Sequence, residues 1–137
     1  MKPKHFAFLL LSVLLTSAGV GLSQTTTLIT FDDLGAGTCT NPITISSGYG
    51  YSHFTWDNFY VLDGIDFCGN PSGFEYGTVS GGSVAYNGGG KKATLSSSKP
   101  FILLSANLTA AWFDDLQVEV QGYVSGNYSG RFDLNAA

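Results

Sequence analysis

The residues best suited to chemistry in this chain are paired carboxylates. The tetrapeptide Phe-Asp-Asp-Leu occurs twice, at residues 31–34 and 113–116. Oxygen ligands in loops suit Ca²⁺, so Asp32 and Asp33 are the candidate metal ligands. The alternative is that both Asp-Asp pairs only form turns, which explains residues 114–115 well. We expect no other cofactor.

Catalytic groups are scarce beyond the predicted leader described below. His53 is the only histidine there, and the nucleophile motif G-x-S-x-G is absent. The glutamates are Glu75 and Glu119, and Glu119 lies on the polar side of an alternating segment. We therefore predict that the protein is not an enzyme. A glycoside hydrolase with two facing acids is the weaker alternative.

Tyrosines are the remaining candidates for binding. A tyrosine ring that reaches water offers an apolar face and a polar hydroxyl, which together suit a sugar. Tyr49, Tyr51 and Tyr60 border the most aromatic segment without clearly belonging to its buried parity. They are our predicted ligand-binding residues. The alternative for each of them is packing against the body of the domain.

The two cysteines, Cys39 and Cys68, predict a disulfide. An even number of cysteines in an exported chain favours pairing. The bond would close a loop of about 30 residues and stabilise the fold by ~3–4 kcal/mol on the chain-entropy model. Two cysteines and one histidine cannot form a zinc site.

The first 23 residues have the features of a secretory signal peptide. Lys2 and Lys4 precede an apolar run at residues 6–15, and Gly21 and Ser23 stand before a cleavage site at Gln24. The run is short for a membrane span. We predict a secreted, extracellular protein with no membrane span after processing. A retained anchor is the alternative.

Residues 24–137 have the size of a single domain. Their formal charge is −6, from four cations and ten carboxylates. This balance argues against binding nucleic acid or an anionic membrane, because such contacts need lysine and arginine. Asn107 and Asn127 begin N-x-S/T sequons and are candidate glycosylation sites.

Short alternating segments separated by glycine-rich turns predict an all-β fold. The segment 49–62 is the expected centre of the core, with Phe54, Trp56, Tyr60 and Leu62 on one parity. We expect a two-sheet antiparallel sandwich of jelly-roll type. We also expect that a closing strand is missing, which would favour self-association through a free strand edge. The expected strands lie at residues 26–32, 43–45, 49–62, 78–87 (two pieces), 93–96, 101–105, 107–113, 116–121 and 128–134, and residues 66–77 are expected to form a loop.

Four sequence segments resemble a family of secreted β-sandwich proteins found in fungi and among bacterial exported proteins of the PEP-CTERM class. They read T-F-D-D-L, F-T-W-D-N-F-Y-V, G-T-V-S-G-G-S-V-A-Y-N-G-G-G and A-N-L-T-A-A-W-F-D-D-L-Q-V-E-V-Q-G-Y. The W-x-N-F and S-G-x-x-V-A-Y-N motifs are the most specific part. The resemblance implies a secreted β-sandwich and carries no assigned activity.

Together these features favour a non-enzymatic secreted protein that binds a polysaccharide, a cell-surface glycan or another extracellular surface. The alternative is a structural or interaction protein of the cell wall or matrix that has no small ligand.

Overall fold

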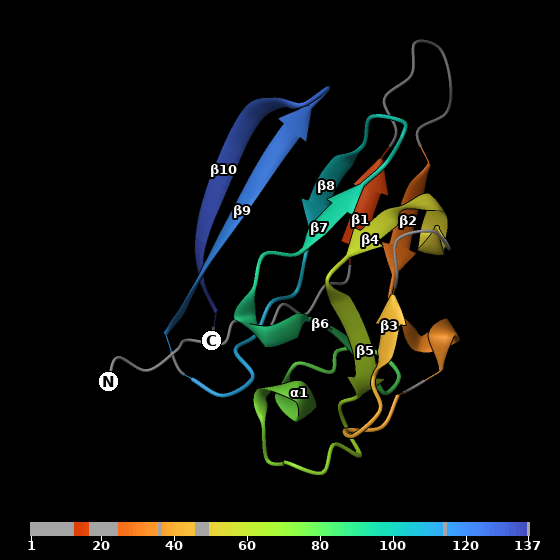
Figure 1. The fold of residues 1–137 in the computed structure, drawn as a ribbon, viewed down its shortest axis with the longest axis vertical. Helices are drawn as coiled ribbons and strands as arrows, with labels where there is room; N and C mark the ends of the chain where they lie inside the picture. The colour runs from red at the N-terminus through yellow and green to blue at the C-terminus, as the bar shows by residue number, and fades with distance from the viewer. Residues whose placement is uncertain (1–12, 17–24, 36, 46–49, 114, 137) are drawn as a thin grey trace.

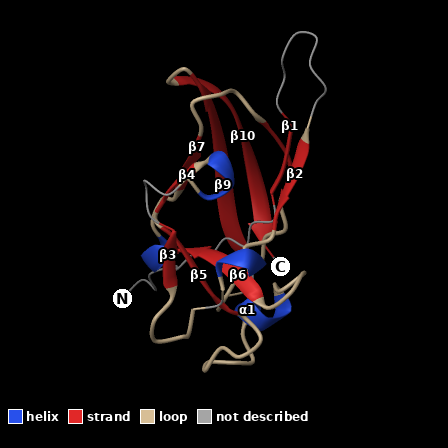
Figure 2. Cartoon of the chain, turned by 90° about the vertical axis from the view of Figure 1, so that its right-hand side faces the viewer, coloured by secondary structure: helices blue, strands red, loops and turns tan. Residues whose placement is uncertain are grey.

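The computed structural model describes residues 13–16, 25–35, 37–45, 50–113 and 115–136 (Figure 1). Side chains are described for residues 25–131 of these ranges. The strands are β1 (Val13–Thr16), β2 (Thr26–Ile29), β3 (Ile43–Ile45), β4 (Thr55–Asp57), β5 (Phe59–Asp63), β6 (Ser83–Asn87), β7 (Thr94–Ser96), β8 (Ile102–Ser105), β9 (Leu116–Val124) and β10 (Asn127–Ala136). Short helical segments join them (Figure 2): the α-helix α1 (Gly73–Tyr76) and 3-10 turns at Asp32–Leu34, Tyr51–His53 and Gly88–Gly90.

Within the described ranges, the strands form four small sheets, and every pairing between these strands is antiparallel. Their orders are β2-β1-β8, β3-β5-β6, β4-β7 and β10-β9. The expectation of a mostly β, antiparallel fold is therefore confirmed. Among the described residues, no helix has the length and apolar character needed to cross a membrane.

The main core is built around Trp56, whose side chain is fully buried. Its ring meets Phe31 and Phe59 edge to face, with centroids 5.4 and 5.1 Å apart. The indole N–H donates to the carbonyl of Tyr51 at 2.9 Å, so the polar atom of the ring is satisfied inside the core. The buried residues of this cluster come from several sheets: Ile29, Phe31, Ile45, Phe54, Trp56, Phe59, Val61 and Ala85.

The aromatic segment is two strands rather than one, and the predicted parity changes between them. Asn58 separates β4 from β5 and has φ of +58°, a left-handed conformation that asparagine tolerates better than most residues. Its side-chain amide donates to the carbonyls of Gly88 and Lys92, at 3.2 and 3.1 Å. The single extra residue brings Phe59 onto the buried face and leaves Tyr60 half-buried.

The expected strand at residues 107–113 is wrong, because this segment is irregular. Its backbone lies against α1, within the stretch 66–77 that we expected to be entirely loop. The amide of Gly73 donates to the carbonyl of Ala111 at 2.9 Å. Trp112, expected on the same side as the buried Ala110, is about half exposed and meets Phe74 edge to face at 5.9 Å. Contact with the helix has replaced strand pairing here.

Two other expected strands are shorter than the pattern suggests. The first ends at Ile29, because Phe31 has φ of +67° and begins the 3-10 turn Asp32–Leu34. In the stretch 78–87 only β6 is a strand, and residues 78–82 are irregular. The structure also places Val13–Thr16, from the predicted leader, as β1 between β2 and β8.

The disulfide between Cys39 and Cys68 is confirmed. The Cα atoms are 5.9 Å apart, within the usual range for a bridge. The bond connects the loop before β3 to the loop after β5.

The hairpin β9–β10 extends from the body of the molecule, as Figure 1 shows in blue. Leu116 anchors its base and is buried against Ala110. Ser125 and Gly126 both have positive φ, the conformation of a type I′ hairpin turn. Residues 121–129, on both sides of this turn, are exposed. The outer half of the hairpin therefore presents its side chains to solvent.

Candidate functional site

A row of polar and aromatic side chains lies on one face of this hairpin. Cross-strand pairing sets Tyr123 opposite Tyr128 and Gln121 opposite Arg131. Glu119 lies two residues before Gln121 on the same strand, so its side chain points to the same face. We call Glu119, Gln121, Tyr123, Tyr128 and Arg131 the hairpin row. At ~3.4 Å per residue, it spans about 14 Å along β9.

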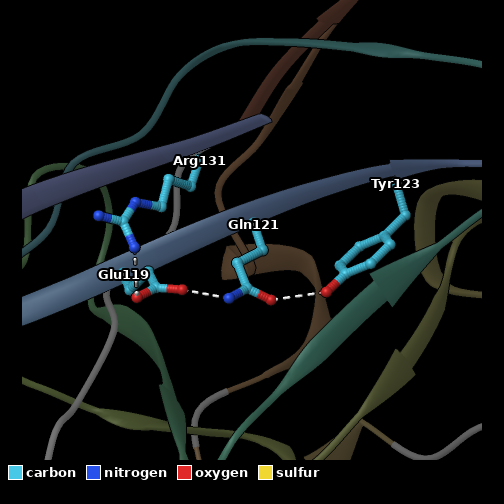
Figure 3. Close-up of polar contacts among 4 residues, drawn as sticks. All are labelled: Glu119, Gln121, Tyr123 and Arg131. Atoms are coloured by element: carbon cyan, nitrogen blue, oxygen red, sulfur yellow. Dashed lines mark hydrogen bonds and ion pairs between the residues drawn. The ribbon is translucent and has the colours of Figure 1, made fainter. Parts of the chain in front are cut away.

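A chain of polar contacts holds the row in order, as Figure 3 shows. The hydroxyl of Tyr123 donates to Oε1 of Gln121 at 2.7 Å. The amide nitrogen of Gln121 donates to Oε1 of Glu119. The guanidinium of Arg131 lies 3.8 Å from Oε2 of Glu119. Each side chain is thereby oriented by its neighbour.

The two tyrosines form the aromatic end of the row. Their ring centroids are 5.9 Å apart and the rings are nearly perpendicular. Tyr123 is 53 % exposed and Tyr128 is 57 % exposed. Solvent therefore reaches a large part of both rings, although the rings support each other through an edge-to-face contact.

This arrangement suits a polar ligand that also has apolar faces. The row contains one carboxylate and one guanidinium, and the strand register sets a second acidic residue, Asp133, opposite Glu119. The guanidinium of Arg131 supplies N–H donors to this face, and each tyrosine hydroxyl can both donate and accept. Aromatic rings beside oriented donors and acceptors match the apolar faces and hydroxyl groups of sugars.

The predicted metal ligands, Asp32 and Asp33, have separate hydrogen-bond partners. Oδ2 of Asp32 accepts from the hydroxyl of Ser80 at 3.1 Å, and Oδ1 accepts from the amide of Ser83 at 3.2 Å. Through these two hydrogen bonds, Asp32 holds both ends of residues 80–83, which lead into β6. Oδ1 of Asp33 accepts instead from the hydroxyl of Tyr51 at 2.5 Å.

The rest of the described chain adds no clustered metal ligands to these two aspartates. Within the part of the chain that the structure describes, no group of three or more His, Cys, Asp or Glu side chains could hold a metal ion. His53 is exposed in the turn Tyr51–His53 and has φ of +67°. The calcium site remains a prediction from the sequence.

The three predicted ligand-binding tyrosines do not form one site. Tyr51 packs against Phe31 with centroids 5.6 Å apart, and burial together with its bond to Asp33 raises the pKa of its phenol. Tyr60 stacks on Tyr86 across the sheet, with centroids 5.6 Å apart. Burial, and to a lesser extent Tyr60, raise the pKa of Tyr86. Tyr49 lies outside the described residues.

Both predicted glycan acceptors are accessible. Asn107 is exposed two residues after β8, and Asn127 is exposed at the first position of β10. An asparagine must be exposed to receive a glycan, and both meet this requirement. That they carry glycans remains a prediction.

The sequence analysis did not identify the hairpin row. The signal was present, since Glu119, Gln121 and Tyr123 recur at every second position. We interpreted the polar side of this strand as ordinary solvated surface. That the outer half of the hairpin would extend beyond the core could not be inferred from alternation.

The chain matches no family model, no curated protein and no solved structure in the comparisons. The resemblance to secreted β-sandwich proteins therefore stays a prediction based on sequence motifs.

Proposed function

We propose that this protein is a secreted, non-enzymatic module that binds carbohydrate in the extracellular space through its hairpin row. The observation that carries the proposal is the row itself: two half-exposed tyrosines in line with Gln121, Glu119 and Arg131, which are already oriented by contacts with one another. A preoriented surface loses less side-chain entropy when a ligand binds.

Chemical considerations separate this function from catalysis. Glu119 is engaged by Gln121 and Arg131, while Glu75 belongs to a different element, α1. Glycoside hydrolysis needs two carboxyl groups within roughly 5–10 Å across the substrate. Glu119 and Asp133 are cross-strand neighbours on one face rather than acids that face each other across a substrate, so stacking and hydrogen bonding favour binding alone.

The proposal includes secretion and a two-layer sandwich of jelly-roll type. The predicted leader and the disulfide support export into an oxidising compartment. Support for two layers comes from the shared core, in which Trp56 of β4 meets Phe59 of β5, although these strands belong to different sheets.

Binding should be weak, because the row is open to solvent. At ~0.3 kcal/mol per heavy atom, a disaccharide of about 23 atoms reaches ~−7 kcal/mol, so we expect a Kd of about 10 µM or weaker. The direct test is retention on insoluble chitin, cellulose and β-glucan, followed by titration with the soluble oligosaccharide of the retained polymer.

The matched variants are Tyr123→Ala and Tyr128→Ala, with Tyr76→Ala as the control. Tyr76 is also an exposed tyrosine, but it lies on α1. Loss of a stacking ring should cost ~1–2 kcal/mol, or about 5- to 30-fold in Kd, while Tyr76→Ala binds as wild type. Failure of the folded protein to bind any of the three polymers would refute glycan binding. Equal binding by all three variants would refute the site.

A further inference from the structure

The sheet β2-β1-β8 contains a strand that the sequence predicts is removed on export. β1 (Val13–Thr16) lies between β2 and β8, as Figure 1 shows, and residues 1–23 form the predicted leader. In the described part of the chain, β1 is the sole strand partner of both β2 and β8. Its removal therefore leaves a position one strand wide, with unpaired backbone groups on both sides.

The residues beside this position are apolar and exposed. Ile102, Leu103 and Leu104 of β8 are 46, 40 and 46 % exposed, respectively. Neither β2 nor β8 contains a charged residue. Natural edge strands are commonly protected by lysine, proline or a bulge. β8 has neither lysine nor proline within its bounds, and its one irregularity is a register shift at Leu104, which lies opposite the step from Leu14 to Leu15 of β1.

β8 itself has the sequence pattern of the strand that is lost. β1 reads Val-Leu-Leu-Thr and β8 reads Ile-Leu-Leu-Ser. Both begin with a β-branched residue, continue with two leucines and end with a hydroxyl residue. A copy of β8 would therefore present nearly the same groups as β1.

The strand directions agree with such a replacement. β1 is antiparallel to both β2 and β8, and Thr16 pairs with Ile102. In a dimer with two-fold symmetry, β8 of one copy lies antiparallel to β8 of the other, so Ser105 of the second copy takes the place of Thr16 opposite Ile102. That strand is also antiparallel to β2, as β1 was.

We propose that, after the leader is removed, β8 of a second copy occupies the position of β1. Each copy donates β8 to the other, giving a continuous four-stranded sheet in the order β2, partner β8, β8, partner β2. The outer edge of β8 pairs with no strand in the described chain, so it can accept β2 of the second copy. Because the joined strands are uncharged, the acidic surfaces impose little repulsion at the contact. This inference is independent of the proposed glycan binding.

The test measures the mass of the secreted wild-type chain in solution. It is produced in a host that adds no N-linked glycan, because Asn107 lies two residues beyond β8. Mass spectrometry reads its N-terminus, and light scattering with size exclusion measures its mass over a range of concentrations. We expect an N-terminus at Gln24 and twice the chain mass at high micromolar concentration, with little change when salt is raised.

Two perturbations address the strand itself. Leu103→Lys places a charge in the shared sheet and should give a monomer, whereas Val79→Lys, at an exposed position outside every strand, should remain a dimer. Since the first variant could fold poorly, the second measurement uses the wild-type chain. A capped peptide of residues 12–17 should compete for the vacated position and produce monomers, while a scrambled peptide should not.

A wild-type chain that stays monomeric at all concentrations would overturn the proposal, whether its leader is removed or retained. So would a dimer that neither Leu103→Lys nor the peptide dissociates. Dissociation by both, with Val79→Lys unaffected, would support the exchange of β8.

Discussion

Replacing Gly73 with alanine is the sharpest test of how α1 packs against the segment 107–113. A Cβ atom at Gly73 would lie 1.7 Å from the carbonyl oxygen of Ala110, 2.5 Å from its carbonyl carbon and 2.7 Å from Cα of Ala111. All three atoms belong to the backbone, so a change of side-chain rotamer cannot relieve the contact. The two segments must separate by roughly 1.5 Å or more to restore ordinary van der Waals distances.

That separation has two energetic consequences. It breaks the 2.9 Å hydrogen bond from the amide of Gly73 to the carbonyl of Ala111, which costs ~1–3 kcal/mol when a buried group loses its partner. It also pulls Ala111 away from Phe74 and Leu62, which form one buried cluster with it. Overpacking of this kind costs a further ~1–3 kcal/mol.

We therefore expect Gly73→Ala to lose about 3 kcal/mol or more, which corresponds to a fall in Tm of about 10–15 °C for a domain of this size. Thermal and urea unfolding followed by circular dichroism measure the change. Gly82→Ala is the matched control, because its Cβ would lie 3.7 Å from the nearest atom, a carboxylate oxygen of Asp63. A melting temperature for Gly73→Ala within a few degrees of Gly82→Ala would refute the described packing of α1.

Two further predictions concern the disulfide and the phenol of Tyr51. Replacing Cys39 and Cys68 together by alanine should lower the unfolding free energy by ~3–4 kcal/mol in urea titrations, and an unchanged midpoint would contradict the stabilising role of the bridge. The raised pKa of Tyr51 means that its contribution to stability is full below pH 10, where the unfolded phenol begins to ionise, and is lost as the pH rises further. Tyr51→Phe should therefore lose less stability than wild type between pH 9 and 11, whereas parallel pH profiles would show that Asp33 and burial do not perturb this group.

Local features of the sequence were sufficient to predict much of the fold. β3, β7, β8, β9 and β10 lie within or close to their expected ranges, because alternation and turn residues act over a few neighbouring positions. The Ser125-Gly126 turn follows from the same local chemistry. The disulfide followed from counting, since Cys39 had only Cys68 as a partner.

Features that depend on distant residues were not predictable in this way. Asn58 interrupts the aromatic segment because its side chain bonds to carbonyls about 30 residues away, and this interruption changes the face that the following strand buries. Residues 107–113 alternate like a strand, yet their backbone packs directly against α1. The contact is at Gly73, where any side chain would collide with the backbone of Ala110 and Ala111.

The candidate site shows the same division. Alternation correctly groups Glu119, Gln121 and Tyr123 on one face of β9, because side chains of a strand point to opposite faces in turn. This alternation would be the same whether that face of β9 were covered by other elements or open to solvent. Tyr51 and Tyr60, which the sequence favoured, are held by Phe31 and Tyr86. The period of two determines which side chains share a face, and only the tertiary structure decided which face meets the core, because that depends on where the rest of the chain lies.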